Sequence, residues 1–220
     1  MDTNALIQGL IMFVAFIPLV TLHEFAHAWV AGLCGDDTPR LQGRVTLDPT
    51  AHIDPLGTII VPLIAAFLGA ASGSVLLFGW GRPVLVNLSN FRNRRRDDIL
   101  VSGAGPLMNL VAAVALLGLM KVLQLSGVNH EHLDTVFRIA RLSVFLCFFN
   151  LLPVPPLDGG HIMRNVVGMT EETYRVLSQY SFMFLIIIMR VPAIGYFVSE
   201  ITNSTLGLLA RPFGWYLTSS

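Results

Sequence analysis

A cluster of ionisable residues inside an apolar stretch near the N-terminus constrains the fold more than any other feature of the sequence. Residues 5–31 have the length and composition of a membrane-spanning helix, for which about 20 apolar residues suffice. His23, Glu24 and His27 stand within this stretch. Because lipid cannot solvate such side chains, ionisable residues within a span usually mark a functional site. We therefore expect a membrane helix that carries one.

The spacing of the two histidines predicts a metal site. Residues four apart lie on one helix face, one turn from each other, so His23 and His27 can reach the same ion. The pattern His-Glu-x-x-His is typical of zinc enzymes, in which the glutamate, here Glu24, acts as a base toward a metal-bound water. The pattern also arises by chance, and a histidine on a helix is often an ordinary interior residue. The apolar surroundings favour the metal.

The composition places the whole chain in a membrane. Of its 220 residues, 54% are hydrophobic and 13% are charged, whereas soluble domains have about 25% charged residues. The net charge is zero, so nothing indicates a nucleic-acid partner. The two cysteines, Cys34 and Cys147, are too few for a disulfide framework. The N-terminus lacks the basic segment of a cleavable signal, so we expect the first helix to remain in the mature protein.

The hydropathy pattern predicts an all-α polytopic membrane protein. Residues 59–72 are apolar but shorter than a straight span requires, so a re-entrant or interfacial segment is expected there. A short strand is expected at 43–47, and a strand or hairpin at the membrane surface over 75–90. We find no repeat and no linker, and predict one domain, residues 1–220, with its core at about 5–165 and C-terminal helices at about 172–210. The five expected spans are 5–31, 99–124, 135–152, 174–190 and 193–210.

A proline-rich break after the third expected span offers another metal ligand. Residues 150–161 read Asn-Leu-Leu-Pro-Val-Pro-Pro-Leu-Asp-Gly-Gly-His, and the prolines end the helix. Irregular backbone at membrane depth is tolerated only where it is buried in protein or lines a wet cavity. Asp158 lies at the end of this break, and we expect it to be the third ligand. By itself, an aspartate before two glycines would be an ordinary turn residue.

The positions of these ligands predict the topology. His23, His27 and Asp158 all stand near the C-terminal ends of their helices, so the two helices must point the same way to share an ion. Residues 99–124 supply the one crossing this requires, and 59–72 should therefore not cross. Basic residues gather on the cytoplasmic side of membrane proteins, which places the metal in the cytoplasmic half of a multi-pass protein of the cell membrane. The arginines concerned are Arg40, Arg44, Arg82, Arg92, Arg94, Arg95 and Arg96.

His52 stands between two Asp-Pro turns in the polar segment that follows the first helix. It is either an interfacial residue that forms hydrogen bonds or a residue that orients a metal ligand, because such sites need supporting partners. The sequence leaves both interpretations open.

The chain resembles the site-2 protease family of intramembrane zinc metalloproteases. Its His-Glu-Phe-Ala-His pattern and the segment 150–160 match the two metal-binding motifs of the family, and 102–109 is similar to its middle core helix. The resemblance covers about residues 10–165 and is greatest to a compact bacterial and archaeal subgroup without a PDZ domain. It implies that His23, His27 and Asp158 bind one zinc ion, that Glu24 is the general base and that Asn150 lies beside the substrate carbonyl.

The expected reaction is hydrolysis of peptide bonds in or near transmembrane segments, with a single-span membrane protein or peptide as substrate and the lipid bilayer as surroundings. A zinc transporter or sensor without hydrolytic activity is the alternative, and a protease-like scaffold is a third. Neither explains a glutamate placed as a base beside the metal ligands. The sequence sets no oligomeric state.

Overall fold

The computed structural model describes residues 2–72 and 79–215. Within these ranges the chain is helical and contains no β-strand. It divides into two compact units, Met1–Arg92 and Asn93–Ser220.

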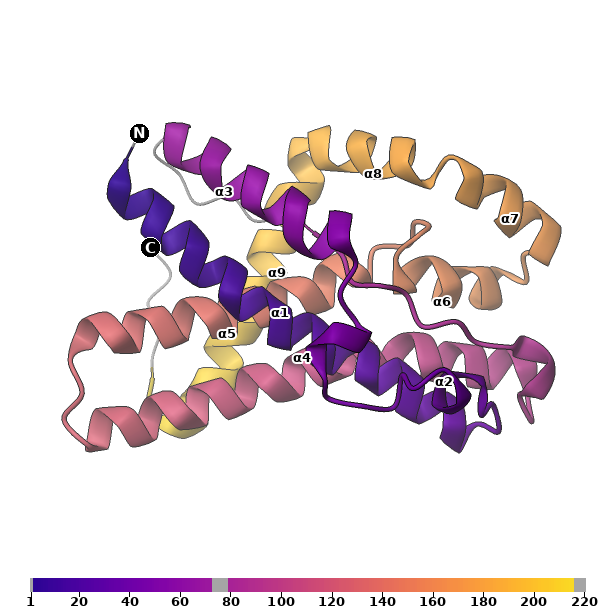
Figure 1. Ribbon diagram of the computed structural model, residues 1–220, viewed down its shortest axis with the longest axis horizontal. Helices are drawn as coiled ribbons and strands as arrows, with labels where there is room; N and C mark the ends of the chain where they lie inside the picture. Colours follow the sequence, from indigo (N-terminus) through magenta and orange to yellow (C-terminus); the bar gives the residue numbers. More distant parts are fainter. Residues whose placement is uncertain (1, 73–78, 216–220) are drawn as a thin grey trace. The chain divides into compact units, whose positions relative to one another are not determined.

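The first unit is built on helix α1, Thr3–Leu33, which the side chain of Asp2 caps by accepting hydrogen bonds from two backbone N–H groups of its first turn. The helix passes Pro18 without a break. It packs beside a second helical segment, a π-helical turn at Pro55–Ile60 that continues into α3, Val61–Ser72 (Figure 1). Small residues allow the close approach, since a Cβ added at Gly9 would lie 3.1 Å from the Cβ of Ala66.

The polar segments of this unit are irregular. A short helix α2, Thr38–Leu41, is followed by a turn, a bend and a 3-10 helix at Pro49–Ala51. The strand expected at 43–47 is not confirmed, because these residues form only the turn and bend. Residues 79–87 are without regular secondary structure and lead to a 3-10 helix at Leu88–Asn90. The hairpin expected over 75–90 is likewise not confirmed, and part of it, 75–78, lies outside the described residues.

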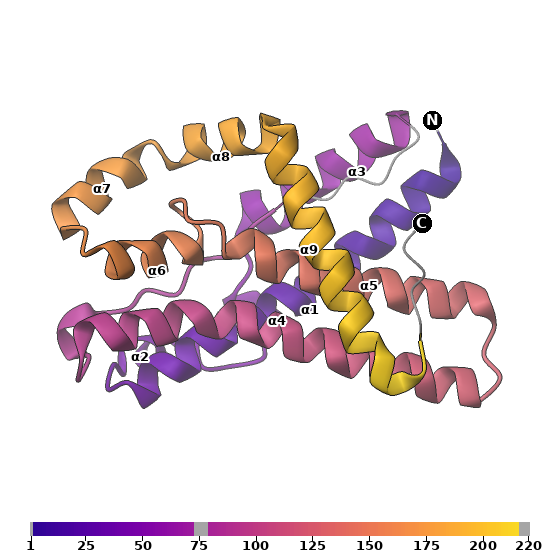
Figure 2. The same ribbon diagram turned by 180° about the vertical axis from the view of Figure 1, so that it is seen from behind.

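The second unit is a helical bundle. Helices α4, Arg94–Leu125, and α5, His130–Asn150, form an antiparallel pair, and α9, Pro192–Ala210, packs across them (Figure 2). The Ser143 hydroxyl joins the pair by donating to the Asn109 carbonyl at 2.7 Å. Apolar side chains from all three helices form one core. The buried members are Ala113, Leu117, Met120, Leu133, Ala140, Val144, Leu206 and Ala210.

Three shorter helices connect α5 to α9: α6, Asp158–Val167; α7, Glu171–Gln179; and α8, Ser181–Arg190. The span predicted over 174–190 is not confirmed, because the helix breaks at Tyr180 and leaves pieces of 9 and 10 residues. At 1.5 Å per residue neither piece reaches across about 30 Å of hydrocarbon.

Among the described residues, three helical segments are long and apolar enough to cross a membrane: Thr3–Leu33, Pro55–Ser72 and Arg94–Leu125. The expected count of five spans is not confirmed. The second of these segments is longer than the sequence suggested, because its helix already starts at Pro55 and reaches 18 residues.

Candidate active site

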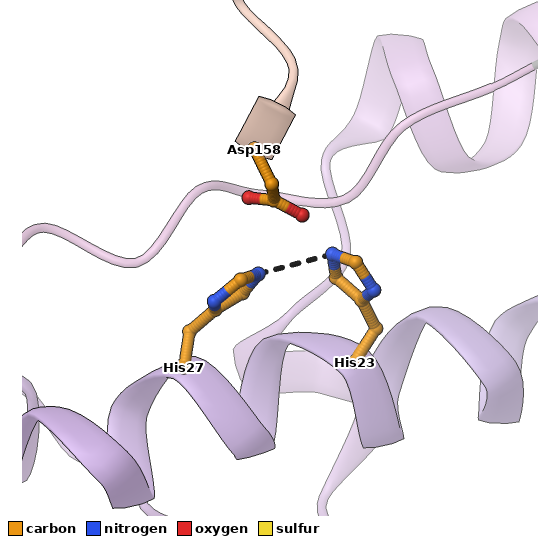
Figure 3. Close-up of side chains that lie close together, drawn as sticks. All are labelled: His23, His27 and Asp158. Atoms are coloured by element: carbon orange, nitrogen blue, oxygen red, sulfur yellow. Dashed lines mark hydrogen bonds between the residues drawn. The ribbon is translucent and has the colours of Figure 1, made fainter. Parts of the chain in front are cut away.

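The two histidines of α1 face each other across one helical turn (Figure 3). Their Nε2 atoms lie 3.0 Å apart, and the rings meet edge to face with centroids 4.7 Å apart. Two nitrogens bound to one tetrahedral zinc ion would lie about 3.3 Å apart. Both imidazoles are buried. The Nε2 atoms of His23 and His27 are therefore close enough for both to reach a single ion.

Glu24 follows the first histidine on the same helix and is also buried. The extended segment 79–87 passes directly over it at Gly81. A Cβ added at Gly81 would lie 2.5 Å from Cγ1 of Val20, 3.2 Å from Cγ of Glu24 and 3.3 Å from its Oε1. Only a residue without a side chain fits there. The sequence analysis did not single out Gly81, although its motif Gly-Trp-Gly was visible between two apolar runs.

One edge of this extended segment is bonded to the loop that precedes α3, taken here as residues 51–58 and including the first residues of the π-helical turn. The backbone N–H of Trp80 donates to Gly57 O at 3.0 Å, and that of Arg82 donates to His52 O at 2.8 Å. In extended backbone, successive residues direct their N–H and C=O groups to opposite edges. The N–H and C=O of Gly81 and the C=O of Pro83 are therefore directed to the other edge of the segment.

His52 is fully buried, and its Nε2 lies 2.9 Å from Thr46 O. The ring is thus fixed within the polar loop of the first unit. Its expected influence on a metal ligand stays a prediction.

Asn150 is the last residue of α5 and is partly exposed. Its side-chain nitrogen donates to Leu146 O at 2.9 Å, a bond that uses one of its two N–H groups. The proline-rich break follows at once and ends at α6.

Asp158 is the first residue of α6, and Figure 3 shows its carboxylate. The two glycines after it let this helix start tightly against the break. A Cβ added at Gly159 would lie 2.2 Å from Leu151 O, and one at Gly160 would lie 2.8 Å from Pro155 N. The absence of side chains at Gly159 and Gly160 therefore allows α6 to start at Asp158, packed closely against the preceding break.

Helix α6 is also joined to the start of α4 by a buried ionic network. Asp98, which is 2% exposed, accepts hydrogen bonds from Arg164 and Asn165, and His161 Nδ1 lies 4.0 Å from the same carboxylate. The Arg164 guanidinium also lies 5.0 Å from the ring of Tyr174. The sequence offered only the basic run before Asp98 as a signal, and that run is typical of an interface anchor.

Comparison with known proteins gives a consistent result. The model of peptidase family M50 matches residues 11–131 and 118–189. YwhC of Bacillus subtilis, by its name a candidate zinc metalloprotease, is 36% identical over 87% of this chain and 85% of its own length. Rip2 of Mycolicibacterium smegmatis, named in the same way, is 30% identical over 82% of this chain and 66% of its own length. Rip2 of Mycobacterium tuberculosis is 31% identical over 79% of this chain and 64% of its own length.

No solved structure matches the chain. The family match covers most of the chain, including both histidines, the glutamate beside them and the Leu-Asp-Gly-Gly segment. This chain therefore belongs to peptidase family M50, the site-2 protease family, and is a zinc metalloprotease.

Proposed function

We propose that this protein is an intramembrane zinc metalloendopeptidase that hydrolyses peptide bonds in or near the transmembrane segments of other membrane proteins. The observation that carries the proposal is the pair of buried imidazoles 3.0 Å apart on an apolar helix, with Glu24 beside them. Charged and ionisable groups are costly in such a helix unless they serve a site.

In this proposal His23, His27 and Asp158 hold one zinc ion per chain. Two histidines and a carboxylate are a frequent ligand set of catalytic zinc, which keeps a fourth position for water or substrate. When bound, the metal would lower the pKa of that water and polarise the scissile carbonyl. The family membership and the spacing of the imidazole nitrogens support this assignment.

The chain's own residues would handle the proton and the substrate. The Glu24 carboxylate accepts the proton of the attacking water and then delivers it to the leaving amine nitrogen. Asn150, through the N–H group not bonded to Leu146, donates to the oxygen of the scissile carbonyl and stabilises the charge that develops there.

An extended substrate would bind along the segment 79–87. Helical substrates hide their carbonyl groups in internal hydrogen bonds, so the scissile region has to unwind. The N–H and C=O of Gly81 and the C=O of Pro83 point away from the residues that hold the other edge, and Gly81 adjoins Glu24. Addition of the substrate as a strand would therefore bring its carbonyl groups past the general base. Single-span membrane proteins are the proposed substrates.

The proposed location is the cell membrane, with the site in its cytoplasmic half. Residues 59–72 belong to a helix long enough to span, whereas the ligand positions require that it does not cross. Tags inserted at Asp36 and Ser72 should both report the cytoplasm, and a tag at Val128 should report the outside. Opposite reports from the first two would mean that 59–72 spans or that Asp158 is not a ligand.

Glu24→Gln tests the reaction. The amide cannot accept the water proton, so cleavage of a co-expressed single-span substrate should fall at least on the order of 100-fold. Zinc content should stay at the wild-type value, because the ligands are intact. If the wild-type chain cleaves no substrate and Glu24→Gln still transports or senses zinc, the protein is a transporter or sensor instead.

A further inference from the structure

Arg44 is a buried cation that does not belong to the metal site. It lies in the irregular loop after α2 and is only 5% exposed. Burying a guanidinium is costly unless its N–H groups are hydrogen-bonded. Its two terminal nitrogens donate to the carbonyl oxygens of Ala51 and Arg82. One side chain thus joins the loop before α3 to the extended segment over Glu24.

The same segment is attached to that loop at three further points. The Arg82 N–H donates to His52 O and the Trp80 N–H to Gly57 O. The Thr58 hydroxyl donates to Trp80 O at 2.8 Å. Both backbone groups of residues 80 and 82 are therefore bonded on one edge, and two of the four bonds come from the side chains of Arg44 and Thr58.

These bonds determine which residue meets the catalytic glutamate. A shift by one residue would bring Trp80 or Arg82 to the place of Gly81, where a Cβ would already lie 2.5 Å from Val20 Cγ1. Trp80 is itself seated against Gly57, since a Cβ added at Gly57 would lie 2.3 Å from the indole ring. The four bonds therefore fix the register of segment 79–83 against α1, and not only its attachment.

We propose that Arg44 is a positioning residue that fixes the register of segment 79–83 against Glu24 and thereby sets the binding of the extended substrate. The kinetic part of this inference rests on the proposed function. The structural part, the register of the segment, does not. Arg44 acts through the carbonyl of Arg82 and is not one of the proposed metal ligands or proton-transfer groups.

The register of the segment is measured first, by fluorescence, in an experiment that requires no enzymatic activity. Trp80 is made the only tryptophan by Trp29→Phe and Trp215→Phe, and its emission and acrylamide quenching are recorded in detergent micelles. Arg44→Lys keeps the charge but cannot reach two carbonyls with the same fork, so the emission should shift to the red and quenching should rise. Arg40→Lys, at an exposed arginine of α2, is the matched control and should leave both unchanged.

The kinetic effect is measured on the purified chain with a single-span substrate. Loss of a hydrogen bond to a charged group should raise KM on the order of 10- to 100-fold, while kcat changes less than about 3-fold and zinc content stays at the wild-type value. A merely stabilising role for Arg44 would lower the unfolding temperature and leave KM unchanged in the zinc-loaded fraction. That result would overturn the proposal.

Thr58→Val keeps the inference testable if Arg44→Lys does not fold. Thr58→Val removes the other side-chain bond to the segment at nearly constant volume, and it should shift Trp80 emission to the red as well. Thr58→Ser keeps the hydroxyl and should have the emission of the wild type. Unchanged emission in both Arg44→Lys and Thr58→Val would refute the fixed register. If wild type itself cleaves nothing, the proposed function fails, and the fluorescence comparison still decides the role of Arg44.

Discussion

The two units of the chain are stabilised in different ways. In the second unit, α4, α5 and α9 satisfy their own backbone groups and are held together by a continuous apolar core. In the first unit, the polar loops contain little regular structure, and side chains such as Arg44, Thr58 and Asp36 bond directly to backbone groups of the segment 79–90. Irregular backbone needs such partners, because buried N–H and C=O groups cannot be left unpaired.

The comparison shows which unit requires an exact alignment of its backbone. The helical bundle needs only apolar side chains of suitable size, and it tolerates volume-conserving changes. The segment over Glu24 must be aligned to one residue, and directional hydrogen bonds provide that alignment where apolar packing would not. The first unit thus carries the proposed base and the proposed substrate segment. The second carries Asp158 on a helix held by glycines and one ionic network.

The largest expected effect tests whether both units contribute to the metal. Asp158→Ala removes the proposed ligand of the second unit, so zinc per chain should fall sharply and cleavage should be lost. Metal analysis of the purified variant measures this. His132→Ala, at an exposed histidine of α5, serves as the control and should keep its zinc. Full zinc content in Asp158→Ala would confine the metal site to the first unit.

The next effect contrasts a buried ion pair with an exposed one. Asp98→Ala leaves Arg164 buried without its carboxylate and should lower the free energy of unfolding by about 3 kcal/mol. Glu171→Ala breaks the exposed pair with Arg94 and should cost less than about 1 kcal/mol. Denaturation in detergent compares the two. Equal losses would mean that the network around Asp98 does not stabilise α6 in the way we describe.

The smallest effect concerns pH and the first unit. Burial of the Asp36 carboxyl would raise its pKa, but hydrogen bonds from Thr38, Asn87 and Asn90 outweigh burial, so the pKa lies below the ordinary 3.8. The charged form therefore stabilises the fold above about pH 4, and this contribution is lost as the pH falls through the lowered value.

Asp36→Asn should consequently lower stability near neutral pH by about 1–3 kcal/mol and flatten the decline below pH 4. Unfolding curves between about pH 2 and 7 test this. Asp37→Asn, at the exposed neighbour, should show neither change. If the stability of Asp36→Asn falls below about pH 4 as steeply as that of the wild type, the pH dependence belongs to another carboxylate.

The sequence alone determined the features that depend on local geometry. Two histidines four apart on a helix must share a face, and His23 and His27 do so. Prolines must end α5, so Asp158 follows a break. Long apolar runs identified α1 and α4 with small errors at their ends. Each of these conclusions needs only neighbours within about one helical turn.

The features that join residues distant in sequence follow only from the folded chain. Hydropathy over 174–190 suggested one span, yet the chain breaks at Tyr180, where the polar α7 ends and the apolar α8 begins. The contact of Gly81 with Glu24, the bonds of Arg44 to Ala51 and Arg82, and the network around Asp98 leave no periodic signal in the sequence. They depend on how loops pack on helices, and in loops side-chain hydrogen bonds, which have no fixed spacing along the chain, determine the backbone path.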